Sequence, residues 1–235
     1  MSYLGWASRS AWYLGQFNKR AKEAGYSNKI AHVLEIGVDR GQTALPLIHN
    51  LSRQELDFRW FGVDIRIDSN FNEQIRVMGG ITVDENVFYI EENSLDFLPN
   101  FIEQNPNFVG FDLIMIDGDH NYETVSKELS YLDKISHPYT MCVVDDYNGK
   151  HANRDDFYAD KDTHKGLDHK DLQRESEKQG VNNAVDDFIE ENEKWKLYNF
   201  FPDEDPVVLF REGASMTYEN KRIMFSIAPL TPLNI

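Results

Sequence analysis

Short runs of β-branched and aromatic residues alternate along the chain with longer segments whose apolar residues recur at helical spacing. The strand-like runs are residues 31–37, 58–65, 86–94, 111–117 and 140–147. Helical spacing follows three of these runs, over residues 42–55, 95–105 and 121–135. Strands that alternate with helices build βαβ units and a parallel sheet. We therefore predict an α/β protein.

The pattern changes beyond residue 181. A helical segment over 182–192 is followed by three strand-like runs with no helix between them, at 194–201, 206–210 and 221–228. Consecutive strands without crossover helices are typical of antiparallel pairing. The predicted fold is thus a Rossmann-like, doubly wound, mostly parallel sheet with antiparallel C-terminal strands that finish it.

The domain organisation follows from the absence of repeats and linkers. We expect one domain over residues 1–235, with an N-terminal helical extension over residues 1–30. One charged segment, residues 149–180, holds almost nothing that could fill a core. It is either a solvated loop or a lid over a site, since long loops in compact domains are often functional. Its histidines match no standard spacing of metal ligands, so we assign them no metal: His151, His164 and His169.

Composition and charge limit the partners. The formal charge of -16 over 235 residues opposes nucleic acid and anionic membranes, which both attract clusters of Lys and Arg. We therefore expect a small-molecule partner, no nucleic acid and no membrane, and the sequence permits a homo-oligomer. The single cysteine, Cys142, is compatible with a reducing compartment, and no apolar run approaches the ~20 residues that span a bilayer. We expect a cytoplasmic protein.

Glycine and polar residues stand at the carboxyl ends of the predicted strands. They are Glu35, Gly37 and Gly41 at the first strand, Asp64 at the second, Ser94 at the third, Asp117, Asp119 and His120 at the fourth, and Asp145 and Asp146 at the fifth. The carboxyl ends of parallel strands meet at one edge of a sheet, and ligands of open α/β sheets bind there. We therefore expect these residues to line one shared site.

The first two strand ends favour an adenosine-type ligand. Gly37 and Gly41 would let the backbone approach a ligand closely, although glycine at such a turn also serves turn geometry alone. Their spacing is not the G-x-G-x-x-G of dinucleotide sites and no Walker lysine follows, so neither NAD nor ATP is expected first. Asp64, about 20 residues later, stands where a carboxylate accepts hydrogen bonds from ribose hydroxyls.

The last two strand ends favour a cation. Three carboxylates, those of Asp117, Asp145 and Asp146, raise one another's pKa unless a cation neutralises them, and oxygen-only ligands select a hard ion such as Mg²⁺. The alternative is that an aspartate here caps a helix or a turn, which is the role that we favour for Asp119. His120 could take a proton beside the ion, or it could be a structural histidine at a helix start.

Six segments between residues 31 and 200 carry a family resemblance: VLEIGVDRGQTALPLI, FGVDI, NSLDFLP, FDLIMIDGDHNYETVSKEL, VVDDY and GVNNAVDDFIEEN. Together they resemble the class I S-adenosylmethionine-dependent methyltransferases. Within that class they are similar to the metal-dependent O-methyltransferase branch that includes methyltransferase family 24 and the macrocin-type sugar methyltransferases. The most specific part is IDGDHNY followed by VDDY.

The resemblance implies a role for each site residue. Glu35, Gly37 and Gly41 would line the methionine end of S-adenosyl-L-methionine, Asp64 would hold its ribose, and Ser94 would lie near its adenine. Asp117 would face the cofactor and, with Asp145 and Asp146, bind Mg²⁺ or a similar divalent cation. His120 would be the catalytic base.

The activity implied is methyl transfer to a hydroxyl of a small molecule, a sugar or another polyol-like acceptor. Two alternatives stay open: a metal-dependent hydrolase that uses the same carboxylates, and a non-catalytic ligand-binding subunit. The chain departs from the family pattern in two places. Residues 136–140, SHPYT, replace the usual Pro-Gly-Gly turn, which we expect to affect only a turn, and the long segment 149–180 leaves the acceptor open.

Overall fold

The structure is a computed structural model of the chain. It describes residues 4–23, 30–54, 56–66, 68, 70–77, 83–155, 176–198, 205–211, 214–219 and 222–227. None of the helices in these ranges is both long enough and apolar enough to cross a membrane.

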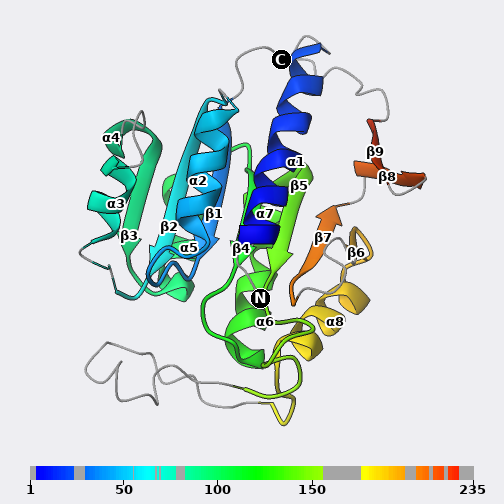
Figure 1. Ribbon diagram of the computed structural model, residues 1–235. Helices are drawn as coiled ribbons and strands as arrows, with labels where there is room; N and C mark the ends of the chain where they lie inside the picture. The colour runs from blue at the N-terminus through cyan, green and yellow to red at the C-terminus, as the bar shows by residue number, and fades with distance from the viewer. Residues whose placement is uncertain are drawn as a thin grey trace.

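A seven-stranded sheet forms the centre of the molecule (Figure 1). Its strand order is β3-β2-β1-β4-β5-β7-β6. The strands are β1 (Ala31–Ile36), β2 (Phe58–Asp64), β3 (Val87–Glu91), β4 (Phe111–Ile116), β5 (Ser136–Val144), β6 (Trp195–Tyr198) and β7 (Val207–Arg211). Strands β1 to β5 pair in parallel, β7 is antiparallel to β5, and β6 is antiparallel to β7. This confirms the predicted fold class.

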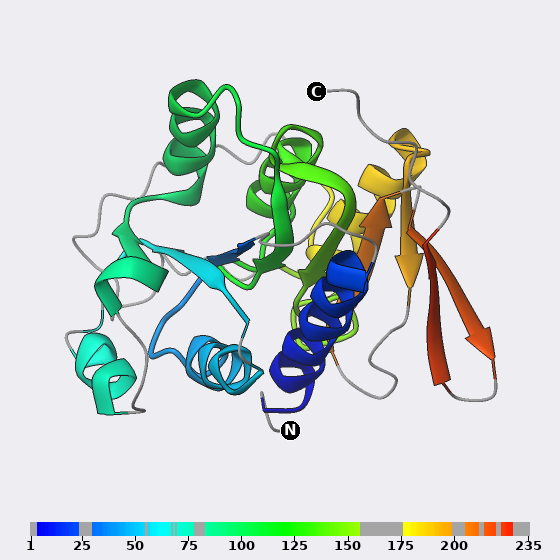
Figure 2. The same ribbon diagram turned by 90° about the horizontal axis from the view of Figure 1, so that it is seen from above.

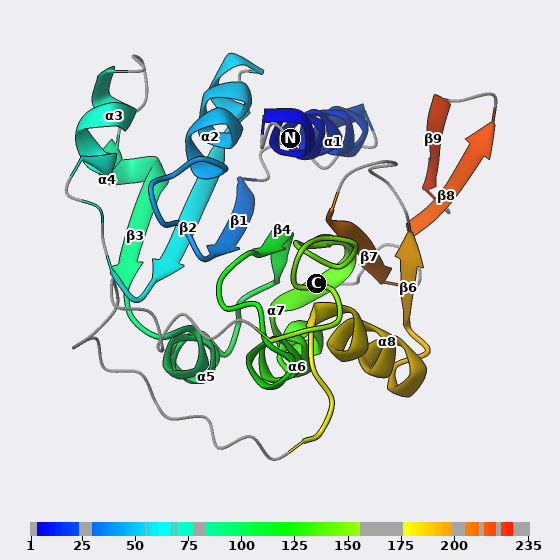
Figure 3. The same cartoon turned by 60° about the horizontal axis from the view of Figure 1, so that its bottom comes forward.

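Helices cover both faces of the sheet (Figure 3). One face carries α1 (Leu4–Glu23), α2 (Ala44–Arg53) and α3 (Phe71–Val77), and the other carries α5 (Ser94–Gln104), α6 (Tyr122–Ser130) and α8 (Val181–Glu191). Two single-turn helices, α4 (Val83–Asn86) and α7 (Leu132–Ile135), lead into β3 and β5. The view from above shows the same layers, with α1 lying close to α2 (Figure 2). The sheet is thus doubly wound.

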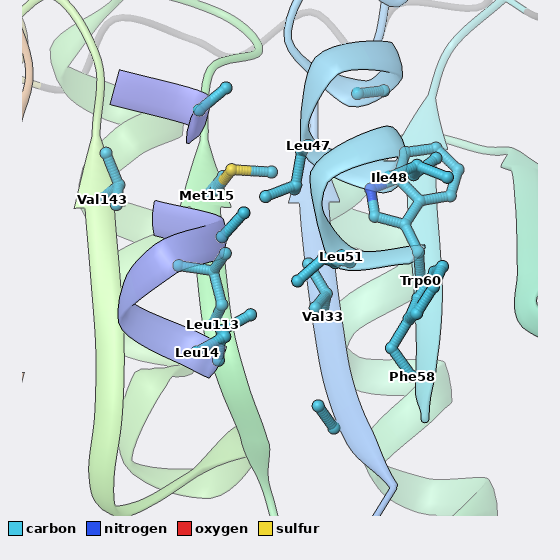
Figure 4. Packing of buried hydrophobic residues seen from close by; sticks show 14 of the residues in the cluster. Leu14, Val33, Leu47, Ile48, Leu51, Phe58, Trp60, Leu113, Met115 and Val143 are labelled. Carbon is cyan, nitrogen blue, oxygen red and sulfur yellow. The ribbon is translucent and has the colours of Figure 1, made fainter. Parts of the chain in front are cut away.

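Side chains alternate between the two faces of the sheet along each strand, and each face has its own hydrophobic core. In β4, Leu113 and Met115 face the α1 and α2 side, and Ile114 and Ile116 face the α5 and α6 side. Successive side chains of a strand point to opposite faces, so a strand covered on both faces is apolar throughout. Figure 4 shows the first core, where Leu14 of α1 joins Leu113. The residues that we assigned to an N-terminal extension therefore include part of a main core layer.

The predicted place of one strand in the sheet is wrong. Residues 221–228 were expected to finish the main sheet, but β9 (Arg222–Ile227) pairs with β8 (Ala214–Glu219) in a separate two-stranded sheet. These two strands are neighbours in sequence, and closing so short a connection costs little chain entropy. Local pairing therefore competes well against pairing with a distant edge.

The SHPYT segment is also different from the expectation of a simple turn. It belongs to β5, because Ser136 already pairs with Phe111 before the register shifts ahead of Leu113. The Thr140 hydroxyl spans this irregularity: it donates to the Phe111 carbonyl oxygen at 2.6 Å and accepts from the His137 amide at 2.8 Å. A side chain thus replaces the missing ladder hydrogen bonds.

A buried carboxylate ties three strands together at the amino end of the sheet. Asp112 is 1% exposed, and its two oxygens lie 2.9 Å from the His32 amide and 3.1 Å from His137 Nε2. His137 Nδ1 accepts from the Tyr139 amide, so Nε2 carries the proton and donates to Asp112. Buried carboxylates need such donors, because an unpaired one is costly.

Replacing Asp112 with alanine should therefore destabilise the protein. Two buried N–H groups would lose their acceptor, and we expect the free energy of unfolding to fall by roughly 2–4 kcal/mol. Urea denaturation followed by circular dichroism measures this change. Asp57→Ala, at an exposed position just before β2, is the control and should stay within about 0.5 kcal/mol. Equal stability of the two variants would contradict the role of Asp112.

Candidate functional site

The carboxylate of Asp64 organises the loop that follows β1. Its Oδ2 accepts hydrogen bonds from the amides of Val38 and Asp39, both at 2.8 Å, and its Oδ1 accepts from the amide of Arg66 at 3.0 Å. A carboxylate has about four acceptor positions, so one position, on Oδ1, remains for a ligand. Asp64 thus holds the glycine loop in shape at the place where the sequence predicted a ribose contact.

The two glycines of this loop are required by packing. Gly37 has φ +85°, and a Cβ there would lie 2.1 Å from the carbonyl oxygen of Asp117. Gly41 has φ +75°, and a Cβ there would lie 2.5 Å from the ring of Phe71. Any larger residue would clash and would be strained at these angles. The structure thus supplies a reason for glycine at both positions that is independent of a ligand.

Glu35 brings a buried carboxyl group to the same edge. It is 0% exposed, and its Oε2 accepts a hydrogen bond from Trp60 Nε1 at 2.9 Å. Its other oxygen, Oε1, has no hydrogen-bond partner among the described residues. Burial raises the pKa of Glu35 to about 8, although the Trp60 hydrogen bond acts in the opposite direction. The group is therefore largely protonated at neutral pH.

Asp117 and Asp145 form a pair at the ends of β4 and β5. The two carboxyl groups share a hydrogen bond. Burial and the charge of Asp145 raise the pKa of Asp117 well above its usual range. Burial also raises the pKa of Asp145, to about 6, with the Asp117 hydrogen bond acting against it. The two carboxyl groups thus share one proton between them. This is the mutual repulsion that the sequence predicted for neighbouring carboxylates.

Asp146 and two histidines complete this corner. Asp146 Oδ2 lies 3.4 Å from His120 Nδ1 and 3.9 Å from His151 Nε2. His120 Nε2 faces the other way, 4.0 Å from Asp117 Oδ1. The two imidazole rings are stacked, with their centroids 5.2 Å apart and an interplanar angle of 18°. The chemistry of the corner is therefore that of three carboxyl groups and two imidazoles.

Ser94 and Asp119 have hydrogen-bonded roles at the starts of helices. Ser94, the first residue of α5, donates to Glu128 Oε1 of α6 at 2.6 Å. Asp119 Oδ2 accepts from Thr124 Oγ1 at 3.1 Å and from the side-chain amide of Asn121, the residue that caps α6. Asp119 therefore supports the start of α6, in line with the helix-start role favoured for it.

The structure brings the predicted residues to the same edge of the sheet. Asp64 binds the loop of Gly37, Gly37 packs against the backbone of Asp117, and Asp117 pairs with Asp145. Ser94 instead turns its hydroxyl toward α6. Within the described part of the chain, however, no three His, Cys, Asp or Glu side chains are arranged to hold a metal ion.

Two functional candidates were missed. His151 was set aside because its sequence spacing matches no ligand pattern, and Glu128 lies at an apparently ordinary helical position. Glu128 is 1% exposed, and a glutamate on the buried stripe of α6 was the available signal for it. No sequence signal pointed to His151, which lies in the charged segment after the fifth predicted strand.

The family comparison decides the class of protein. Residues 34–147 match the model of a family described as a methyltransferase domain, methyltransferase family 24. This region of the chain is a methyltransferase domain. The match confirms the resemblance drawn from the sequence and the expectation of a methyltransferase enzyme. No curated protein matches the methyltransferase chain.

Solved structures share its fold. A provisionally named O-methyltransferase from Klebsiella pneumoniae is 17% identical with a TM-score of 0.50, over 89% of this chain and 88% of that one. CalS11, a TDP-rhamnose 3′-O-methyltransferase of calicheamicin biosynthesis, is 13% identical with a TM-score of 0.52, over 84% and 78%. A Corynebacterium glutamicum protein is 12% identical with a TM-score of 0.50, over 90% of each chain. At these identities the likeness concerns the fold alone.

The buried carboxyl of Glu128 predicts a pH dependence of stability. Burial raises its folded pKa from 4.5 to about 8, against the opposing hydrogen bond from Ser94. Between these values the unfolded chain releases a proton that the folded protein keeps, so the free energy of unfolding falls as pH rises. Glu128→Gln keeps an acceptor for Ser94 and should gain about 1.4 kcal/mol over wild type for each pH unit in this window. Denaturant unfolding from pH 4.5 to 8 tests this, and a constant difference between the two proteins would contradict it.

Proposed function

We propose that the methyltransferase domain moves a methyl group from S-adenosylmethionine to a hydroxyl of a small molecule, assisted by a divalent metal. The observation that carries the proposal is the arrangement at the carboxyl edge of the sheet. There the Asp64 carboxylate accepts hydrogen bonds from the loop after β1. The carboxyl pair formed by Asp117 and Asp145 lies at the same edge, with His120 close to Asp117. Nucleoside-binding and proton-accepting groups thus share one edge.

The residues present fit the cofactor. After binding its three amides, Asp64 keeps one acceptor position, on Oδ1, for a ribose hydroxyl. Glu35 Oε1 is a buried oxygen with no partner among the described residues, and a bound ammonium would favour the ionised form in which it accepts. S-adenosylmethionine carries hydroxyls at its ribose and an ammonium at its methionine end. Asp64 and Glu35 would hold these two parts.

The chemistry of the carboxyl groups also fits a hard cation. Asp117, Asp145 and Asp146 offer only oxygen, the ligand that Mg²⁺ prefers. Burial and mutual repulsion raise the pKa values of Asp117 and Asp145, and a bound cation would relieve that repulsion. These three residues would hold the ion after the shared proton leaves. The ligand set rests on charge and residue type, because the described carboxyl groups are not arranged to hold a metal ion in this structure.

The chemistry divides between the bound groups and the chain. When bound, S-adenosylmethionine supplies a methyl on a positively charged sulfur, and the divalent cation supplies charge that favours an ionised oxygen. The chain orients the reactants, and holding an oxygen and a methyl carbon in line at about 3 Å removes much of the entropic barrier. His120 has Nδ1 toward Asp146, so Nε2 is the atom that would accept the hydroxyl proton.

The acceptor in this proposal is a sugar or another polyol-like molecule. Three observations support it: the resemblance to macrocin-type enzymes, the shared fold with CalS11, and the charge of -16, which disfavours polyanionic partners. A cytoplasmic location is part of the same proposal, since S-adenosylmethionine is made there and Cys142 is a buried free thiol. A lid over the acceptor formed by residues 149–180 is proposed with it; residues 156–175 lie outside the described residues.

Asp64→Asn should weaken S-adenosylmethionine binding. The amide removes the charge and one acceptor oxygen, which leaves a loop amide or a ribose hydroxyl unpaired. We expect affinity to fall by ~10–100-fold, the effect of a lost charge-assisted hydrogen bond. Isothermal titration calorimetry measures it, with Asp57→Asn, at an exposed position, as the matched control. Wild-type affinity in a folded Asp64→Asn protein would remove Asp64 from the ligand site.

The variants Asp145→Asn and His120→Gln should distinguish loss of metal binding from loss of the catalytic base. Asp145→Asn should weaken Mg²⁺ binding by at least ~10-fold, because a neutral oxygen replaces a charged one. His120→Gln should leave Mg²⁺ affinity nearly unchanged but lower the turnover of an accepted substrate by ~10²–10⁴. Calorimetry with MgCl₂ and turnover with and without chelator measure the two effects. Full activity in chelator would refute the metal, and full activity of His120→Gln would make this histidine structural.

A further inference from the structure

His151 is buried in the site although the charged segment that contains it looked solvated. Its side chain is 7% exposed, as shielded as that of His120, which is 9% exposed. The two rings lie nearly parallel, 18° apart, with centroids separated by 5.2 Å. Stacked rings at this spacing make favourable contact and restrict one another's rotation. His151 therefore forms one wall around the proposed base.

A tight turn returns the chain from Asp146 to His151. Asp146 has φ +56°, uncommon for a residue with a side chain, and its carbonyl accepts from the Gly149 amide at 3.1 Å. Its Oδ1 accepts from the Lys150 amide, also at 3.1 Å, which leaves Oδ2 directed to the two histidines. Strained backbone persists where the surroundings over-determine it, and such sites are often functional.

Helix α8 holds the backbone of His151 from the other side. The His151 carbonyl accepts from the Val181 amide at 3.1 Å, and the next carbonyl, of Ala152, accepts from the Asn182 amide at 2.9 Å. The residue before α8 is Gly180, which has no side chain to cap these amides. The carbonyls of His151 and Ala152 therefore do the capping, and this fixes where the His151 ring stands.

A carboxylate further along strengthens the same anchor. Asp155 Oδ1 accepts from the Tyr122 amide of α6 at 2.9 Å and from the Gly180 amide at 2.8 Å. Tyr122 follows His120 by two residues, so this contact connects the His151 segment to the His120 segment. The segments that carry the two histidines are thus connected by the hydrogen bonds of Asp155.

We infer that His151 is a positioning residue for His120: by stacking on the imidazole beside Asp146, it keeps Nδ1 toward Asp146 and Nε2 toward Asp117. The inference deepens the proposed function, because Nε2 is the atom proposed to accept the proton. A carboxylate facing Nδ1 favours the tautomer with its proton there. Without the stacked ring, His120 can rotate and this preference is lost.

The tautomer of His120 is the direct readout. Long-range ¹H–¹⁵N spectra of protein labelled at histidine distinguish the two ring nitrogens, and the His120→Gln spectrum assigns the His120 signals. Spectra are recorded without metal or cofactor at about pH 8, where an ordinary imidazole is neutral. His151→Phe keeps a flat ring, whereas His151→Leu fills space without one; His151→Met replaces the leucine variant if that fails to fold.

We expect His120 to carry its proton at Nδ1 in the wild type and in His151→Phe, and to show averaged tautomers in His151→Leu. Thermal unfolding checks that the variants fold. An unchanged His120 pattern in a folded His151→Leu protein overturns the inference, as does a wild-type His120 protonated at Nε2 or averaged tautomers in His151→Phe. Because the readout needs neither S-adenosylmethionine nor an acceptor, its failure is separate from a failure of the proposed function.

Discussion

The carboxyl groups of Asp117 and Asp145 meet at the ends of two neighbouring parallel strands, and ionising both there is costly. The pairing of β4 with β5 continues to Ile116 and Val144, so the next residue of each strand is brought to the same place. Burial and the charge of Asp145 raise the pKa of Asp117, and the protein meets this constraint by sharing a proton between the two groups. A bound cation would also offset the repulsion between the two carboxylates. The proposed metal site and its chemistry therefore depend on this pair.

Asp64 has a complementary role on the other side of the edge. It binds amides of the loop after β1, and that loop packs through Gly37 against the backbone of Asp117. The Asp64 side and the Asp117 side of the proposed site are thus in direct contact through backbone. At the opposite edge, the Asp112 carboxylate binds the His32 amide and His137 Nε2. Buried polar contacts thus tie the strands together at one end of the sheet, and the proposed binding site lies at the other.

Most of the fold follows from local pattern. Alternating strands and helices predicted the order of elements, and the rule that parallel strands share an edge predicted that Asp64, Asp117 and Asp145 would gather. What the pattern missed depends on contacts between distant residues. The Thr140 hydroxyl extends β5, and α8 fixes His151 through backbone hydrogen bonds that any residue could make. A threonine in the sequence does not reveal a partner 29 residues away, and backbone hydrogen bonds leave no signal in residue type. Hydrophobic period could not tell β9 in its own hairpin from a strand of the main sheet.

A crystal structure of the protein with S-adenosylhomocysteine tests the central claim most directly, since it shows whether the carboxyl edge of the sheet is the cofactor site. The account predicts density with the ribose hydroxyls at the Asp64 carboxylate and the sulfur on the side of Asp117 and His120. Density for the ligand elsewhere on the molecule, or ribose hydroxyls that make no contact with Asp64, would contradict the account.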